Sequence, residues 1–357
     1  MILPGSTIGI LGGGQLGRMM AMAAAELGYH VHIYCPEENC PASEVAKFTT
    51  VGDYDDAQEL KRFAKSVDVV TYEFENIPAG PVIELKKFVS VLPDPSILAA
   101  AQHRVHEKQA LRKLGVPTTE FAPVNSEKEL KKALDTIGLP AVLKTARMGY
   151  DGKGQAMMRK AADVEKWIGG ECILEGFIKF RMEISVIVAR GTNGTIVCYP
   201  PVQNIHKNHI LSETIAPAPI TPPLARKAEK IACDIAKGLN LVGLLAVEMF
   251  ITDKDKILVN ELAPRPHNSG HWTLDACLTS QFEQTIRAVC GLPLGSTDRM
   301  CDARMINLIG NDVKEWESYL KKPTARLHLY GKKEARSGRK MGHVTLLSVK
   351  GKITMMN

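Results

Sequence analysis

The sequence predicts a mixed fold of the α/β and α+β classes, with a doubly wound parallel domain first and antiparallel sheets towards the C-terminus. Three stretches carry this prediction. Residues 6–17, STIGILGGGQLG, combine a short apolar strand with a glycine turn that opens a helix. Residues 139–156 place a glycine-rich segment with a lysine between two strands. Residues 245–263 form two apolar strands around the polar turn DKDK, the pattern of a hairpin.

The composition is that of an ordinary soluble globular protein. The 357 residues, 45% of them hydrophobic, suffice for two or three domains. No apolar run approaches the roughly 18–20 residues of a membrane span, and the N-terminus lacks signal-peptide features. Eight cysteines without a CxxC pair indicate a reducing cytoplasm. A net charge of +6 with 6% aromatic residues suits small anionic substrates as well as nucleic acid. We expect a cytoplasmic protein with no nucleic-acid or membrane partner.

Residues 1–95 alternate strands and helices with short glycine and proline breaks, which predicts the doubly wound domain. The glycines of GGGQLG satisfy G-x-G-x-x-G before a helix expected over 18–28. Backbone N–H groups at such a turn favour an anion. A dinucleotide site needs an acidic residue after the second strand, HVHIY, but a cysteine and a proline stand there. We therefore prefer a phosphate-bearing substrate at this turn over NAD.

A further pair of candidates follows the apolar run Asp68–Tyr72, which predicts a buried parallel strand. Glu73 and Glu75 come directly after it. Ligands of open α/β sheets bind outside the carboxyl ends of the strands. The two glutamates are therefore candidates for ligand binding, with ordinary surface charge as the alternative.

The next stretch supplies cations and a flexible loop. A helix over 96–114 carries Arg104 and Lys108 on one face, either as solvated charge or as a clamp on phosphate. Lys144 lies in the strand AVLKTA, and GYDGKGQ follows at 149–155. Such a loop can close over polyphosphate with its N–H groups. A plain β-turn is the alternative, and the motif is not a P-loop.

The hairpin at 245–263 brings two carboxylates together. Centring it on DKDK pairs residue 252 with 257, 250 with 259 and 248 with 261. Glu248 and Glu261 then stand opposite each other with Cβ atoms roughly 5 Å apart, where like charges destabilise a sheet. Mg²⁺ is the natural cation between them because it takes carboxylate and phosphate oxygens, and Asn260 adds a further oxygen nearby. Two solvated glutamates on an edge hairpin are the alternative.

The remaining elements are less informative. We expect a short helix at 163–169, a hairpin at 194–215 that contains His206 and His209, helices at 224–238 and 273–290, and strands at 300–310 and 324–330. The last turn carries five basic residues that either capture a phosphate or are simply solvated: Lys332, Lys333, Arg336, Arg339 and Lys340.

A glycine-rich flap with a lysine, a carboxylate pair suited to Mg²⁺ and a separate domain for a second anion are the parts of an ATP-dependent ligase. Five motifs, in this order, resemble the N5-carboxyaminoimidazole ribonucleotide synthases of the ATP-grasp superfamily: GGGQLG, YEFENIP, KTARMGYDGKGQ, VEMF…VNELAPRPHNSGH and YGKKEARSGRKMGH. The resemblance covers almost the whole chain. It implies three domains: a pre-ATP-grasp α/β domain at 1–95, a small flap domain at 96–180, and a C-terminal domain at 181–357 with the metal hairpin and phosphate-binding strands.

The resemblance also implies a role for each matching position. Mg²⁺ would be bound by Glu248 and Glu261. Arg265 would stabilise carboxyphosphate, and Tyr150 and Asp151 would position or deprotonate the amine of the substrate. The implied ATP contacts are Arg104, Lys144, Gly149, Tyr150, Asp151, Gly152, Lys153, Gly154, Gln155, Glu175, Gly176, Phe177, Ile178, Glu183, His206, Asn260 and Glu261. The implied contacts of aminoimidazole ribonucleotide are Gln15, Leu16, Glu73, Arg265, His267, Asn268, Ser269 and Arg339, with either Lys332 or Lys333.

The family's reaction belongs to purine biosynthesis and uses ATP, bicarbonate and 5-aminoimidazole ribonucleotide. The resemblance further implies a homodimer. Met148 departs from the family pattern, which has a glycine before Gly149-Tyr150, so flap closure is in question. Formate-dependent glycinamide ribonucleotide transformylase and biotin carboxylase are alternatives within the superfamily. An NAD-dependent oxidoreductase and a non-catalytic nucleotide sensor are alternatives outside this catalytic class.

Overall fold

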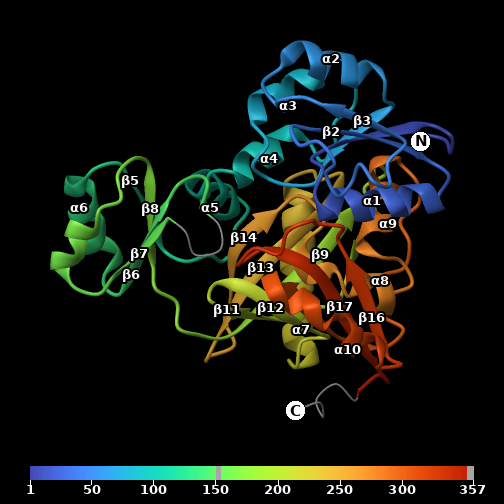
Figure 1. The fold of residues 1–357 in the computed structure, drawn as a ribbon. Helices are drawn as coiled ribbons and strands as arrows, with labels where there is room; N and C mark the ends of the chain where they lie inside the picture. The colour runs from blue at the N-terminus through green and yellow to red at the C-terminus, as the bar shows by residue number, and fades with distance from the viewer. Residues whose placement is uncertain (150–153, 352–357) are drawn as a thin grey trace.

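The computed structural model describes residues 1–149 and 154–351. Four residues of the predicted flap lie outside the described residues: Tyr150, Asp151, Gly152 and Lys153. Figure 1 shows three bodies, each built around its own sheet: an N-terminal body in blue, a small body in green, and a large body that runs from yellow to red. These sheets fall within the three predicted domains, whose boundaries stay predictions.

The N-terminal body is a parallel sheet with helices on both faces. Its strand order is β3-β2-β1-β4, and every neighbouring pair is parallel. Helix α1 packs on one face, and α2 and α3 pack on the other. This confirms the doubly wound prediction. The bounds are β1 Thr7–Leu11, α1 Gln15–Glu26, β2 His30–Cys35, β3 Phe48–Val51, α2 Ala57–Lys65, β4 Val69–Tyr72 and α3 Ala79–Leu85.

The single helix predicted over 96–114 is wrong, because two helices occupy this stretch. Helix α4 (Pro95–Ala101) ends before His103, which is extended at φ −125° and ψ 105°. Helix α5 (Arg104–Lys113) then starts in a new direction, and its first N–H donates to the carbonyl of Ala146 at 2.9 Å. This contact with the small body replaces the helical hydrogen bond that a continuous helix would make.

The small body is an antiparallel sheet of order β5-β8-β6-β7, covered by α6. A 3-10 turn at Ala161–Lys166 stands where the helix at 163–169 is predicted. The bounds are β5 Phe121–Val124, α6 Glu127–Ile137, β6 Ala141–Thr145, β7 Gln155–Met158 and β8 Cys172–Gly176.

The large body contains a nine-stranded antiparallel sheet in the order β14-β13-β9-β11-β12-β15-β17-β16, with β10 paired to β9. Its strands are β9 Phe180–Arg190, β10 Ile196–Cys198, β11 Val202–Lys207, β12 Ile210–Ala216, β13 Gly243–Thr252, β14 Ile257–Ala263, β15 Asp302–Ile309, β16 Ala325–Leu329 and β17 Lys340–Ser348. Helix α7 (Pro222–Gly238) packs against β9, and α10 (Trp316–Leu320) packs against β16.

The helix predicted over 273–290 is also wrong in its length. It consists of α8 (Thr273–Ala276) and α9 (Gln281–Val289). Cys277 is extended between them, and the Ser280 hydroxyl caps α9 by accepting the N–H of Glu283. Leu278 is 59% exposed in this break.

Helix α9 fixes the N-terminal body to the large body. Its apolar face lies beside α1, and Phe282, Ile286 and Val289 belong to the same buried cluster as Ile8 and Met20. The shared core holds the N-terminal body against the large body (Figure 1). Within residues 1–149 and 154–351, no helix combines the length and the hydropathy that crossing a membrane requires.

Candidate active site

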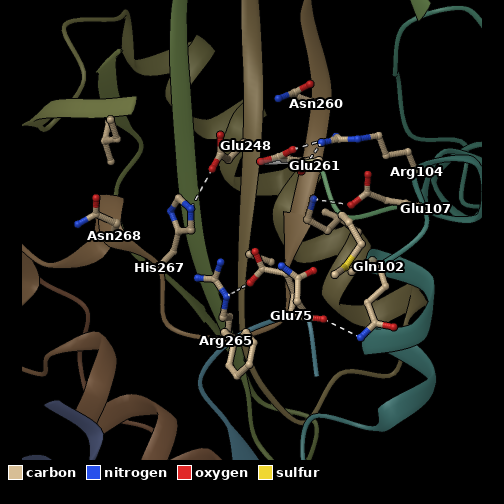
Figure 2. A pocket seen from close by; sticks show the side chains of 18 of the residues that line it. Glu75, Gln102, Arg104, Glu107, Glu248, Asn260, Glu261, Arg265, His267 and Asn268 are labelled. Carbon is tan, nitrogen blue, oxygen red and sulfur yellow. Dashed lines mark hydrogen bonds and ion pairs between the residues drawn. The ribbon is translucent and has the colours of Figure 1, made fainter. Parts of the chain in front are cut away.

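A cavity of about 630 Å³ lies where the three bodies meet. Its wall combines residues that are distant in sequence, from the glycine turn, the loop after β4, and the elements α5, β6, β9, β11, β13 and β14. Figure 2 shows acidic and basic side chains from these elements pointing towards one another. The following predicted site residues line it: Gln15, Leu16, Glu73, Arg104, Lys144, Gly149, Gln155, Glu183, His206, Glu248, Asn260, Glu261, Arg265, His267 and Asn268.

The hairpin β13–β14 places Glu248 directly opposite Glu261, as predicted. The predicted register nearer the turn is wrong, because residue 251 pairs with 257 and residue 250 with 258. A β-bulge at Asn260 absorbs the one-residue difference before the strands reach the carboxylates. Each carboxylate has a basic partner: Glu248 lies 2.9 Å from Nε2 of His267, and Glu261 lies 3.3 Å from the guanidinium of Arg104.

Arg265 is held at the centre of the cavity by Glu75 (Figure 2). Its Nε donates to the Glu75 carboxylate, and Nη1 donates to the carbonyl of Pro266 at 2.9 Å. Burial opposes the charged form of Glu75, but the neighbouring guanidinium outweighs burial and holds the pKa of Glu75 at about 2. Gln102 fixes the loop by donating to the carbonyls of Glu75 and Ile77. The ion pair therefore joins the N-terminal body to the loop after β14.

The loop after β14 is ordered by a chain of hydrogen bonds behind His267. Its Nδ1 lies 2.8 Å from the hydroxyl of Ser269, which accepts a hydrogen bond from Ser185 at 2.7 Å. Ser269 is fully buried and supports His267 from outside the cavity wall. Asn268 reaches the wall and exchanges two hydrogen bonds with Asn307, at 2.9 and 2.7 Å. Of these two neighbouring residues, only Asn268 lines the cavity.

Glu175 lies between two lysines at the base of the small body. Nζ of Lys144 donates to it at 2.6 Å, and Nζ of Lys108 lies 3.7 Å away. Burial opposes ionisation of Glu175, but these ammonium groups hold its pKa at about 2. Lys108 is only 1% exposed, so the solvated helix face considered for it is wrong.

The contacts of Glu175 with Lys144 and Lys108 should make the free energy of unfolding depend on pH. An unfolded glutamate has a pKa of about 4.3, so the depressed folded value stabilises the protein above that pH and the contribution is lost as the pH falls. Between pH 6 and pH 3.5, the difference in free energy of unfolding between the protein and Glu175→Gln should shrink by about 1 kcal/mol. Urea unfolding at both pH values measures it. Glu120→Gln, at an exposed ion pair with Arg112, is the control, and a pH-independent difference for Glu175→Gln would contradict the assignment.

The glycine turn is already occupied by a protein carboxylate. The N–H groups of Gly14 and Gly17 donate to Glu73, at 2.8 Å for Gly17. Gly12 has φ +106°, and a Cβ there would lie 2.3 Å from Glu73 Cγ. Two amides of the turn therefore hold Glu73 at the cavity wall, and Gln15 and Leu16 of the same turn also line the cavity. A phosphate-bearing substrate at this turn stays a prediction. Burial raises the pKa of Glu73, although the two N–H groups oppose the rise.

A basic turn between β16 and β17 approaches the same end of the cavity. Lys332 is partly buried and donates to the carbonyl of Lys340 at 2.8 Å, and Lys340 itself lines the cavity. Burial lowers the pKa of Lys332 to about 8, and the charge of Arg339 acts in the same direction. Lys333 is exposed. The turn therefore directs Lys332, rather than Lys333, towards Glu73.

Some predicted residues lie away from the wall. Within the described residues, the following do not line the cavity: Gly154, Glu175, Gly176, Phe177, Ile178, Ser269, Lys332, Lys333 and Arg339. Sequence reasoning missed Gln102 and Glu107 as lining residues. It named Glu75 as a candidate for ligand binding from its position after a buried strand, but it did not predict that Glu75 pairs with Arg265. Met148, just before the predicted flap, has φ +60°. This left-handed region favours glycine, which is the residue that the family pattern has at this position.

Comparison with known proteins gives this geometry its context. Three family models match the chain: the ribonucleotide synthetase preATP-grasp domain at 5–102, the ATP-grasp domain at 109–282, and the phosphoribosylaminoimidazole carboxylase C-terminal domain at 303–352. The N5-carboxyaminoimidazole ribonucleotide synthase of Bacillus subtilis is 47% identical over 353 residues, which cover 97% of this chain and 93% of that protein. The chain belongs to the N5-carboxyaminoimidazole ribonucleotide synthase family.

Other members of the family agree. A crystal structure of an N5-carboxyaminoimidazole ribonucleotide synthetase complexed with ADP superposes with a TM-score of 0.96 at 46% identity, covering 99% of this chain and 96% of that one. The Aspergillus clavatus synthase in complex with ADP and 5-aminoimidazole ribonucleotide gives 0.91 at 30% identity, covering 97% and 94%. The bifunctional purine synthesis protein of Dictyostelium discoideum is 50% identical over 96% of the chain, which spans only 37% of that longer protein.

Family membership settles the class of protein. The fold is an ATP-grasp fold preceded by a pre-ATP-grasp domain, as predicted. The chain is an ATP-grasp ligase, so the alternatives of an NAD-dependent oxidoreductase and a non-catalytic nucleotide sensor are rejected.

Proposed function

We propose that this enzyme carboxylates the exocyclic amine of 5-aminoimidazole ribonucleotide, with ATP and bicarbonate, in purine biosynthesis. Bicarbonate attacks the γ-phosphorus of ATP to give carboxyphosphate and ADP. The amine then captures the carboxyl carbon, directly or after release of CO₂, and phosphate and a proton leave. The observation that carries the proposal is one cavity that joins the paired glutamates of β13 and β14, Arg265, and residues at the ends of β1 and β4.

ATP is placed between the small body and the β13–β14 hairpin. Lys144 and Arg104 line this end, and the Arg104 guanidinium also donates to the carbonyl of Gly149 at 2.8 Å, so it lies at the start of the flap. The N–H groups of Gly176 and Phe177 already donate to Glu120 and Pro140. Adenine is therefore placed against the next backbone groups along the chain, the carbonyl of Phe177 and the N–H of Ile178.

The ribose would lie at Glu183. This carboxylate is an acceptor on β9 that lines the cavity, 2.5 Å from Nδ1 of His206 on β11. Burial opposes the charged form of His206, but the Glu183 carboxylate outweighs it and raises the pKa of His206. The Glu183 carboxylate offers two acceptor oxygens to ribose hydroxyl groups.

The donor set of the hairpin fits Mg²⁺. Glu248 and Glu261 stand opposite each other on one face, the bulged Asn260 adjoins them, and all three line the cavity. Carboxylate and amide oxygens are the ligands that this ion takes, together with substrate phosphates. When bound, Mg²⁺ would offset negative charge on the transferring phosphoryl group. His267 and Arg104 orient the two carboxylates from either side.

Arg265 is the residue proposed to stabilise carboxyphosphate. A guanidinium matches a planar carboxylate or a phosphate with two parallel hydrogen bonds, and Glu75 fixes its orientation in advance. Tyr150 and Asp151 stay proposals for positioning the substrate amine and lie outside the described residues. A homodimer and a cytoplasmic location belong to the same proposal; they rest on the resemblance and on the eight free cysteines.

The second substrate is placed at the ends of β1 and β4, against Gln15, Leu16, Glu73 and Asn268. Its phosphate would meet Lys332 and Arg339. We expect Lys332→Met to raise the KM for aminoimidazole ribonucleotide by about 10- to 100-fold, since a hydrogen bond to a charged group contributes about 1.5–3 kcal/mol. Lys333→Met is the matched control, with a change below about twofold. Initial rates of ADP release against substrate concentration measure both, and equal effects would contradict the assignment.

The function itself is tested by product analysis. The purified chain is incubated with ATP, Mg²⁺ and ¹³C-bicarbonate, with and without aminoimidazole ribonucleotide. ADP release should be stimulated by the ribonucleotide, and ¹³C NMR should show a labelled carbamate. Stimulation by glycinamide ribonucleotide with formate instead would overturn the proposal.

A further inference from the structure

The β-bulge in β14 decides which face of the sheet Glu261 occupies. From Ile257 to Val259 the strands pair one for one, and Glu248 then pairs with Glu261 instead of Asn260. Side chains alternate between the two faces of a strand, so a slip of one residue moves every following side chain to the other face. Without the bulge, Asn260 would stand opposite Glu248, and Glu261 would point away from the cavity.

A bulge removes backbone groups from the ladder, and those groups need other partners. Helix α5 supplies the partner for one of these backbone groups. Nζ of Lys108 donates to the carbonyl of Asn260 at 2.6 Å and to that of Val259 at 3.2 Å. Thr118 adds a hydrogen bond to the Val259 carbonyl at 2.9 Å. A buried ammonium is costly unless it is paired and hydrogen-bonded, and here Glu175 supplies the opposite charge.

Glu107, the residue before Lys108, holds the backbone on the other side of the bulge. Oε1 of Glu107, which is 3% exposed, accepts the N–H of Leu262 at 2.7 Å. Arg104, one turn earlier on α5, reaches the Glu261 carboxylate itself (Figure 2). One face of α5 therefore contacts the backbone before Glu261, the backbone after it, and its side chain.

We propose that Lys108 and Glu107 are positioning residues that hold the bulge at Asn260 in the register that turns Glu261 towards Glu248. They act on the divalent-cation site through the backbone of β14. Lys108 does not line the cavity, and the carboxylate of Glu107, which does, is held by the N–H of Leu262. The inference rests on the proposed function, because it assigns the bulge a purpose in binding the ATP-associated cation.

The test compares Lys108→Met with Lys113→Met, the same substitution at an exposed position of the same helix. Mn²⁺ affinity in the presence of ADP is measured from the electron paramagnetic resonance signal of free Mn²⁺. The half-saturating Mg²⁺ concentration and the KM for aminoimidazole ribonucleotide are measured separately. Lys108→Met should weaken Mn²⁺ binding and raise the Mg²⁺ requirement by about 10- to 100-fold, the range for residues behind a metal ligand. The KM for the ribonucleotide should stay within about twofold, as it involves the other end of the cavity.

Unchanged Mn²⁺ affinity in folded Lys108→Met would overturn the inference. A wild-type chain that binds Mn²⁺ with ADP but does not carboxylate the ribonucleotide would overturn the proposed function instead, so the two failures are distinguishable. Lys108→Arg should recover part of the affinity, because a guanidinium can still donate to both carbonyls.

A second pair of variants covers the case in which Lys108→Met fails to fold. Glu107→Gln keeps an acceptor for the N–H of Leu262, and Glu107→Leu removes it. We expect Mn²⁺ affinity to fall by about tenfold in Glu107→Leu and by less than about threefold in Glu107→Gln. Equal losses in the two variants would assign the effect to the charge of Glu107, and no loss in either would deny it a positioning role. Either result overturns the inference.

Discussion

Replacing Glu261 by glutamine is expected to lower kcat by about a thousandfold, because a bound cation contributes several kcal/mol to stabilising charge in phosphoryl transfer. An amide oxygen is a weaker ligand for Mg²⁺ than a carboxylate. The fold should remain, since the side chain is 41% exposed and its ion pair with Arg104 is 3.3 Å long. The free energy of unfolding should change by less than about 1 kcal/mol.

Steady-state ADP release measures the loss, and urea unfolding measures the stability. Asp253→Asn, in the exposed turn of the same hairpin, is the control for removing a carboxylate from this element, and it should leave both quantities unchanged. A Glu261→Gln enzyme that turns over within threefold of wild type would remove Glu261 from the cation site.

Replacing Arg265 by lysine has the second largest expected effect. Lysine keeps a positive charge near Glu75 but lacks the planar fork that binds an anion with two parallel hydrogen bonds. Removing one donor that stabilises a developing oxyanion costs about 10²–10³ in kcat, so a hundredfold loss is expected. The retained charge keeps a partner for the partly buried Glu75 carboxylate.

The control is Arg181→Lys, which makes the same substitution in an ion pair with Asp255 outside the cavity. Bicarbonate-dependent ADP release without aminoimidazole ribonucleotide isolates the first step. If Arg265 acts on carboxyphosphate, this partial rate should fall together with kcat. A kcat that falls while the partial rate stays at the wild-type value would move Arg265 to the second substrate.

Much of the site was predictable because the chemistry lies in short, local motifs. The polar turn DKDK between two apolar runs predicts the hairpin, and strand alternation puts both glutamates on one face. The apolar run before Glu73 predicts a buried parallel strand whose carboxyl end faces a ligand. In each case one element and its immediate neighbours decide the outcome, and the same motifs carry the resemblance to the family.

What the sequence did not predict has a different origin. The N–H groups of Gly14 and Gly17 donate to Glu73, which lies 56 residues after Gly17. The helix predicted over 96–114 breaks because the backbone N–H of Arg104 donates to the carbonyl of Ala146 in the small body. Helical periodicity and glycine spacing report the preferences of a segment, and a contact with a distant segment overrides them.

The sequence by itself determined the family, the hairpin and the pairing of Glu248 with Glu261. The tertiary structure alone decided how that pairing arises and what supports it. The bulge at Asn260, the buried Lys108 that holds it, the Glu75 partner of Arg265 and the approach of Lys332 all depend on packing between bodies. The physical reason is that the burial of a charge, and the partner that makes this burial tolerable, are properties of the assembled fold.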